Sequence, residues 1–190
     1  MASCCQLLHG QEIDFPINQW KDKLSVKEDF VQKNFMEVYY GIEAYDSLHQ
    51  CMALDKLREK LGDGNIRYQL RFDLLHFTFT TRTAHCMDTT YDYAGVLQKD
   101  LRTCYELEDD LLAAQINEAL SWVYEIKNEL GQSIMYMTSG KEIREKVGLE
   151  KFGQNASEFL RLGDLLYKAR DYEEAIANER KAILYKGKTP

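Results

Sequence analysis

Residues 156–189 have the sequence ASEFLRLGDLLYKARDYEEAIANERKAILYKGKT, which predicts two amphipathic helices joined by a tight turn. Apolar residues recur at helical spacing on the first helix, at Phe159, Leu162, Leu165 and Leu166. Gly163 lies in the middle of this apolar face. An interior glycine costs a helix about 1 kcal/mol relative to alanine, so we expect a packing reason for it. The small residues Ala175 and Ala182 on the second helix would allow the two helices to approach closely.

The same stretch resembles a tetratricopeptide repeat, a helix–turn–helix unit of 34 residues. The positions that characterise the family fall on Phe159, Leu162, Gly163, Tyr172, Ala175 and Ala182. Two positions differ, because Arg170 stands where the turn usually has glycine and Gly187 stands where a proline usually closes the unit. The resemblance implies an all-α fold in which antiparallel helix hairpins stack into a right-handed solenoid that serves as a binding scaffold.

The rest of the chain continues the alternation of helical segments. Apolar periodicity predicts hairpins over about 26–64, 65–109, 110–153 and 154–189. Their starts are spaced more widely and less evenly than 34 residues. This spacing suits either a variant of the repeat with longer helices or the helices of one all-α domain that merely alternate. The three close-packing positions fall on Ser121, Ser133 and Gly140 in the third hairpin, on Ala84, Val96 and Thr103 in the second, and on Met36, Leu48 and Asp55 in the first.

The periodicity of apolar residues does not determine the secondary structure of two segments. HFTFTTRT, residues 76–83, is rich in β-branched and aromatic residues and alternates, so taken alone it would predict a strand. We expect it to belong to a helix over 66–87, because the neighbouring segments are helices. Residues 1–25 are expected to be irregular, with a helix beginning near Ser25, where Ser25 and Glu28 form a capping-box pattern.

Composition and charge exclude several classes of protein. The net charge of −7 over 190 residues argues against non-specific nucleic-acid binding, which needs clustered Lys and Arg. No apolar run approaches the length that predicts a membrane span. The five cysteines, at positions 4, 5, 51, 86 and 104, form no CxxC pair, so we expect reduced thiols. No histidine or cysteine pair has ligand spacing, so neither a metal nor a cofactor is expected.

The N-terminal segment, residues 1–25, does not decide in which cellular compartment the protein functions. Residues 2–10 suit the tail of a signal peptide whose start is missing, but the basic region and the full apolar stretch of a signal peptide are absent. A loosely docked terminus is the alternative. The first interpretation places the chain in the periplasm or outside the cytoplasm, whereas the scattered cysteines favour the cytoplasm.

The resemblance also implies a ligand groove on the concave face, lined by the first helix of each hairpin. The corresponding residues are Gln115, Glu118, Trp122 and Glu125 in the third hairpin, and Ser157, Leu160, Asp164, Tyr167 and Lys168 in the fourth. A tryptophan near carboxylates suits a protein or peptide partner with a basic or aromatic anchor. The alternative is that Trp122 packs against the next hairpin and the carboxylates are solvated.

These patterns support two functional hypotheses. The first is a non-enzymatic scaffold that binds a protein or peptide. Loops such as EKLGDGN (59–65), together with the apparent signal remnant, are similar to the arrays that precede bacterial sensor kinases, which would make the chain the sensory fragment of a signal-transduction protein. The rival hypothesis is a small all-α hydrolase or ribonuclease that uses Arg71 and His76, which have the R-x4-H spacing of helical ribonucleases. Five residues turn a helix by about 140°, so these two side chains do not share a face.

Overall fold

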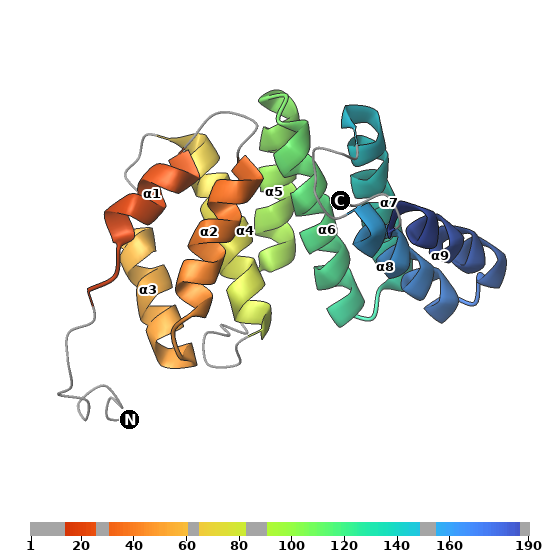
Figure 1. Cartoon of the computed structure of the whole chain (residues 1–190), viewed down its shortest axis with the longest axis horizontal. Coiled ribbons are helices and arrows are strands. Elements are labelled where there is room, and N and C mark those ends of the chain that lie inside the picture. The colour runs from red at the N-terminus through yellow and green to blue at the C-terminus, as the bar shows by residue number, and fades with distance from the viewer. Residues whose placement is uncertain (1–13, 26–30, 61–64, 83–90, 149–154, 187–190) are drawn as a thin grey trace.

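The computed structural model describes residues 14–25, 31–60, 65–82, 91–148 and 155–186, and its regular structure there is entirely helical (Figure 1). The helices are α1 (Ile17–Ser25), α2 (Val31–Glu43), α3 (Ser47–Glu59), α4 (Ile66–Arg82), α5 (Tyr93–Glu106), α6 (Asp110–Ile126), α7 (Leu130–Val147), α8 (Asn155–Lys168) and α9 (Tyr172–Lys186). No strand occurs among these residues. The predicted all-α fold class is therefore confirmed.

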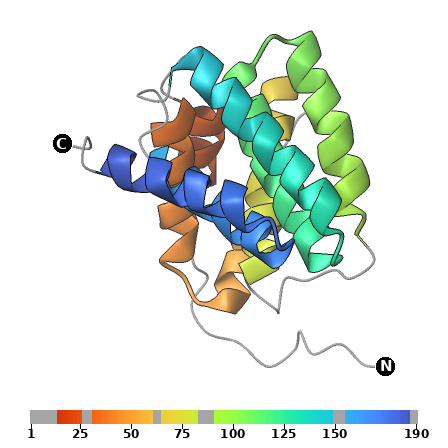
Figure 2. The same cartoon turned by 90° about the vertical axis from the view of Figure 1, so that its right-hand side faces the viewer.

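Helices α1 and α3 lie at one end of the long axis of the molecule and α9 lies at the other, with the remaining helices between them (Figure 1). The packing is most extensive within the pairs α6–α7 and α8–α9. Helix α1 also packs on α3 and α4, and α4 also packs on α6, although these helices are not neighbours in the chain. Figure 2 shows α9 at the outside of the C-terminal end. One large apolar core joins α1 to α6, and a smaller cluster around Met137, Leu162 and Leu165 joins α7 to α8.

Helix α1 corrects the expectation for the N-terminal segment. Residues Ile17–Ser25 are helical, and Ser25 is the last residue of this helix rather than the cap of the next one. Trp20 and Leu24 are buried one turn apart and pack with α2, α3 and α4. A helix this short is stabilised by tertiary burial rather than by its own propensity, which is why its local sequence gave a weak signal. Glu28, the other half of the expected capping box, lies outside the described residues.

The strand-like segment around residue 76 is helical, as expected. It lies in α4, which is buried on most sides between residues 68 and 80. The hydroxyls of Thr78, Thr80 and Thr81 each donate a hydrogen bond to a backbone carbonyl four residues earlier, at 2.8, 2.8 and 2.9 Å. These bonds satisfy the polar groups of β-branched residues inside a helix. Packing from several sides therefore overrides local strand propensity here, and the expected continuation to residue 87 lies outside the described residues.

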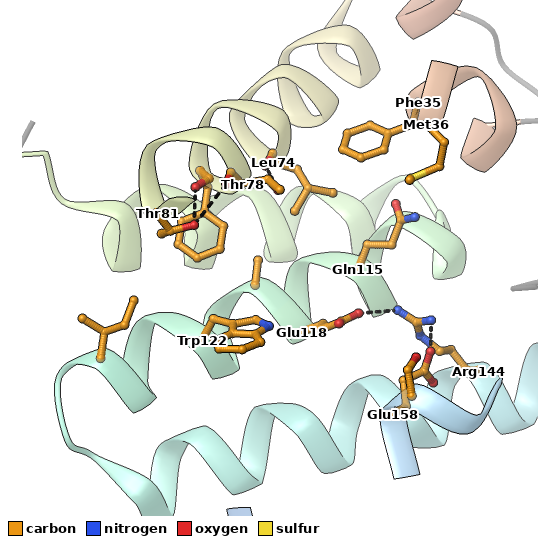
Figure 3. A pocket seen from close by; sticks show the side chains of 14 residues that line it. Phe35, Met36, Leu74, Thr78, Thr81, Gln115, Glu118, Trp122, Arg144 and Glu158 are labelled. Carbon is orange, nitrogen blue, oxygen red and sulfur yellow. Dashed lines mark hydrogen bonds and ion pairs between the residues drawn. The ribbon is translucent and has the colours of Figure 1, made fainter. Parts of the chain in front are cut away.

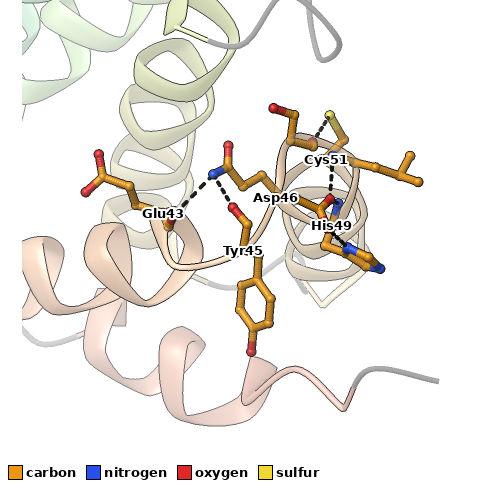
Figure 4. A network of polar contacts seen from close by, with 8 residues as sticks. Glu43, Tyr45, Asp46, His49 and Cys51 are labelled. Carbon is orange, nitrogen blue, oxygen red and sulfur yellow. Dashed lines mark hydrogen bonds and ion pairs between the residues drawn. The ribbon is translucent and has the colours of Figure 1, made fainter. Parts of the chain in front are cut away.

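The turn between α2 and α3 is fixed by polar contacts (Figure 4). Asp46 caps α3 by accepting hydrogen bonds from the backbone N–H groups of Leu48 and His49, both at 3.1 Å, and its other oxygen lies 2.6 Å from His49 Nδ1. These contacts lower the pKa of the Asp46 carboxyl. Gln50 donates to the Tyr45 carbonyl at 2.6 Å. The cap and the amide together stop α2 and start α3.

The two described cysteines differ in state. Cys51 takes part in a disulfide, which corrects the expectation of a reduced thiol at that position. Cys104 is a buried free thiol on α5, as expected, and burial raises its pKa to about 12. Cys4, Cys5 and Cys86 lie outside the described residues.

Three helix junctions share one turn geometry. One residue in each turn has a left-handed backbone, with φ of 53° at Glu108, 60° at Asn128 and 66° at Arg170. The residue after it donates its backbone N–H to a carbonyl five residues earlier, over 2.8 to 2.9 Å, at Asp109, Glu129 and Asp171. These are Schellman turns, which favour glycine at the left-handed position. Arg170 therefore has a left-handed conformation that glycine adopts more readily than other residues.

Small residues set the distance between paired helices, as expected. A Cβ atom at Gly163 would lie 3.2 Å from the backbone oxygen of Ala175, and one at Gly140 would lie 3.1 Å from the backbone oxygen of Ala114. The Ser133 hydroxyl, which is buried, donates to the Ser121 carbonyl at 2.8 Å. The pairs α6–α7 and α8–α9 are thus closely packed at the positions that the sequence identified.

Candidate functional site

A cavity of about 580 Å³ is lined by residues of α2, α4, α6, α7 and α8 (Figure 3). Its apolar wall consists of Phe35, Met36, Leu74, Phe77, Ala119, Trp122 and Ile126. Its polar lining consists of Thr78, Thr81, Gln115, Glu118, Arg144, Ser157 and Glu158. Such a volume, with an apolar wall and polar groups gathered on the rest of its lining, is in the range of a ligand pocket.

Four of the nine predicted groove residues line this cavity, namely Gln115, Glu118, Trp122 and Ser157. They lie on α6 and at the start of α8. Trp122 is 45% exposed, although it is large and apolar. Its side chain is therefore available to a ligand rather than enclosed in the core.

The polar end of the cavity is organised by Arg144, which lies between Glu118 and Glu158 (Figure 3). Arg144 comes from α7 and is only 5% exposed. Its Nη2 donates to Glu118 at 2.9 Å, and its Nη1 donates to Oε1 of Glu158. Two carboxylates therefore share one guanidinium.

Glu158 is the most unusual group at this end. It is 3% exposed, and its Oε2 has no hydrogen-bond partner among the residues that the structure describes. Burial raises the pKa of this carboxyl to about 7, and the nearby charge of Glu118 adds to the shift, although Arg144 opposes it. Near pH 7 the carboxyl is therefore poised between its neutral and ionised forms.

The other predicted groove residues lie beside the cavity. Glu125 accepts hydrogen bonds from Arg161 and Lys168, both at 2.8 Å, and Lys168 also pairs with Asp164 at 2.7 Å. Burial alone would raise the pKa of Glu125, but the hydrogen bonds from Lys168 and Arg161 bring it below its ordinary value. This network ties α6 to α8 and does not line the cavity.

Two further predicted residues are exposed on α8. Leu160 is half exposed, and the ring of Tyr167 lies 5.4 Å from that of Tyr172. The guanidinium of Arg161 lies 3.2 Å from the centre of the Trp122 ring, so one face of the tryptophan already has a cationic neighbour.

Sequence reasoning missed Arg144 and Glu158, as well as the lining from α2 and α4. Arg144 is on the second helix of its pair, which the family pattern does not assign to the groove. Glu158 precedes Phe159 on the buried side of α8, and an acidic residue at that place was a faint signal. The lining residues of α2 and α4 belong to the first two predicted hairpins, in which the three close-packing positions of the repeat are not all occupied by small residues.

Arg71 and His76 are held within the helix packing. Arg71 is 1% exposed and donates from Nη1 to the Leu24 carbonyl of α1 at 2.5 Å. His76 is partly buried and stacks with Phe72 and Tyr93, with ring centres 5.9 Å apart in both cases. Neither side chain lines the cavity described above.

A second group of buried acids lies between α4 and α5. Burial raises the pKa of Asp100 to about 7, with a further contribution from the charge of Asp73, whose own pKa is also raised by burial. Asp73 accepts a hydrogen bond from Gln69 at 2.9 Å, whereas Oδ2 of Asp100 has no partner among the described residues. Neither residue lines the large cavity or the smaller pocket beside α1.

Comparison with known proteins gave no family model, no curated protein and no solved structure that matches this chain. Within the described residues, no helix is both long and apolar enough to cross a membrane. The described side chains also include no cluster of three or more His, Cys, Asp or Glu residues that could hold a metal ion.

Proposed function

We propose that this protein is a non-enzymatic scaffold of the tetratricopeptide type that binds a peptide segment of a partner protein in the cavity of α2, α4, α6 and α8. The observation that carries the proposal is the position of the cavity. Apart from Arg144 of α7, its lining comes from α2, α4, α6 and α8. In the proposed repeats these are the first helices of the hairpins, where the resemblance to the family would put a ligand groove.

The repeat assignment draws support from two features that α6–α7 and α8–α9 have in common. Both pairs use a Schellman turn with a left-handed residue, at Asn128 and Arg170. Both also have small residues at the helix contact, represented by Ser121 and Gly163. In the proposed architecture the pairs stack as an α-solenoid, and each new pair extends the groove.

The composition of the cavity suits a peptide rather than a reacting substrate. Apolar side chains from α2, α4 and α6 line the cavity together with Trp122, and an exposed tryptophan beside a polar rim is typical of a binding anchor. The similarity of the loops to sensor arrays adds the narrower proposal that binding serves signal transduction. That narrower proposal rests on resemblance alone.

Selection from a random heptapeptide library on the immobilised full chain tests peptide binding. We expect specific sequences to be enriched on the wild type and to lose binding on Trp122→Ala. Tyr40→Ala is the matched control, because Tyr40 is an exposed aromatic residue outside the cavity. Absence of enrichment over a blank surface, or equal binding to Trp122→Ala, would contradict the proposal.

A further inference from the structure

The charge at the polar end of the cavity is unbalanced. Glu118 and Glu158 share the single guanidinium of Arg144. Among the described residues that line the cavity, Arg144 is the only one with a positive charge. When both carboxylates are ionised, one negative charge at this end is not compensated.

The unpartnered Oε2 of Glu158 is a second, independent sign of a missing group. Buried polar atoms in folded proteins almost always have a hydrogen-bond partner, so an exception calls for an explanation. This oxygen belongs to a side chain that is nearly fully buried and lines the cavity (Figure 3). A hydrogen-bond donor on a ligand would satisfy it.

The other positively charged side chains near the polar end of the cavity contact groups other than Glu118 and Glu158. Arg161 is held by Glu125 and lies over the Trp122 ring, and Lys168 is paired with Glu125 and Asp164. Lys141 and Lys181 lie 6.0 and 5.9 Å from the centre of the Phe159 ring, from α7 and α9. The charged groups that face Glu158 are therefore Glu118 from α6 and Arg144 from α7.

We infer that the cavity selects a peptide in which a lysine or arginine side chain adjoins an apolar side chain, with the cation donating hydrogen bonds to Glu158 and Glu118. The apolar side chain would lie against the wall formed by Leu74, Phe77, Ala119 and Trp122. Charge-assisted hydrogen bonds are stronger than neutral ones and are strongest where water is excluded. The inference rests on the proposed function, and it specifies the chemistry of the peptide.

The burial of Glu158 adds a pH dependence to the same site. A cation favours the ionised carboxyl, whose pKa without ligand is about 7. Binding of a basic peptide should therefore tighten as the pH rises from about 6 to 8 and then level off. Glu118 and Arg144 are the groups that modulate this titration.

The test uses heptapeptides selected from the random library on the full-length chain. For each enriched peptide, a version with norleucine in place of the basic residue keeps the aliphatic length and removes the charge. Titration calorimetry then compares the two versions on the wild type, Glu158→Gln and Glu118→Gln. Glu142→Gln is the control, because it makes the same charge change at an exposed position outside the cavity.

We expect the enriched peptides to contain Lys or Arg beside an apolar residue. Norleucine should weaken binding about tenfold or more on the wild type and on Glu142→Gln, and by less than about threefold on Glu158→Gln. Glu118 is more exposed than Glu158, so Glu118→Gln keeps the test valid if Glu158→Gln fails to fold.

Three other results would count against the account in different ways. Enriched peptides without a basic residue, or with acidic residues, would overturn the inference and leave peptide binding in place. The same norleucine effect on the wild type and both cavity variants would also overturn it. Absence of any enriched peptide would instead overturn the proposed function itself.

Discussion

Gly163 of α8 lies directly against the backbone of Ala175 in α9, so that an added Cβ atom would be 3.2 Å from the Ala175 oxygen and 3.1 Å from Cγ of Glu179. Glu179 is exposed, so its side chain has room to turn away, but the Ala175 oxygen belongs to a helix backbone and cannot move alone. The close contact of α8 with α9 therefore depends on the absence of a side chain at position 163.

Substitution of Gly163 should destabilise the protein in proportion to the size of the new side chain. We expect Gly163→Ala to lower the free energy of unfolding by about 1 kcal/mol and Gly163→Leu by more than about 3 kcal/mol, because α9 must shift. Chemical denaturation measures both values. Gly131→Ala is the control, since nothing lies within 4 Å of its added Cβ and the change should be neutral or stabilising. A Gly163→Leu protein as stable as the wild type would show that α8 and α9 do not meet there.

Glycine at the left-handed turn positions should stabilise the protein. Arg170 has a φ of 66°, which strains a residue with a Cβ atom by about 1 kcal/mol. We expect Arg170→Gly to raise the free energy of unfolding by about 0.5 to 1 kcal/mol, since the gain exceeds the added entropy of the unfolded chain. Arg180→Gly, within α9, should instead destabilise by about 1 kcal/mol. Equal effects of the two changes in thermal melts would rule out the Schellman turn.

Removal of the Asp100 charge should stabilise the protein at high pH. The folded-state pKa of about 7 lies above the ordinary value of 3.8, so the folded protein keeps a proton that the unfolded chain releases. Stability that is present at pH 4 is therefore lost as the pH rises to 7. We expect Asp100→Asn to be about 1 to 3 kcal/mol more stable than the wild type at pH 8 and similar to it at pH 4.

Denaturation curves at pH 4 and pH 8 measure this effect, and Asp55→Asn, at an exposed position of α3, is the control. The difference in stability between Asp100→Asn and the wild type should be larger at pH 8 than at pH 4. An equal difference at both pH values would mean that the Asp100 carboxyl does not hold a proton in the folded protein.

Loss of the Arg144 guanidinium should destabilise the protein most strongly at high pH. Arg144→Met leaves Glu118 and Glu158 close together without their shared cation, which we expect to cost about 3 to 5 kcal/mol at pH 8. The loss should be smaller at pH 5, because Glu158 is then protonated. The double variant Arg144→Met/Glu158→Gln should recover part of the stability at pH 8. An equal loss at both pH values would argue against the coupling of these groups.

Local patterns in the sequence were enough to predict most of the helices and the close contacts between them. Gly163 and Ala175 identified a helix contact because only small residues allow it, and Ser121 and Ser133 did the same in the preceding pair. Helix α1 was missed because it is short, and its burial depends on contacts with α2, α3 and α4 that periodicity does not describe.

The candidate site was predictable only on one side. The resemblance to the tetratricopeptide repeat predicted Trp122 and Glu118 as groove residues, and both line the cavity. The meeting of Arg144 with Glu158 depends on how α7 packs against α8, which the sequence does not specify. Such long-range pairing gives no local signal, although it determines the charge of the cavity.

The fluorescence of Trp122 tests peptide binding in the cavity most directly. The chain has two tryptophans, Trp20 and Trp122, so Trp20→Phe leaves Trp122 as the only reporter. Titration of this variant with a selected heptapeptide should shift the Trp122 emission saturably, with the same Kd that calorimetry gives. Binding detected by calorimetry without any change in Trp122 emission would place the peptide elsewhere and contradict the proposed groove.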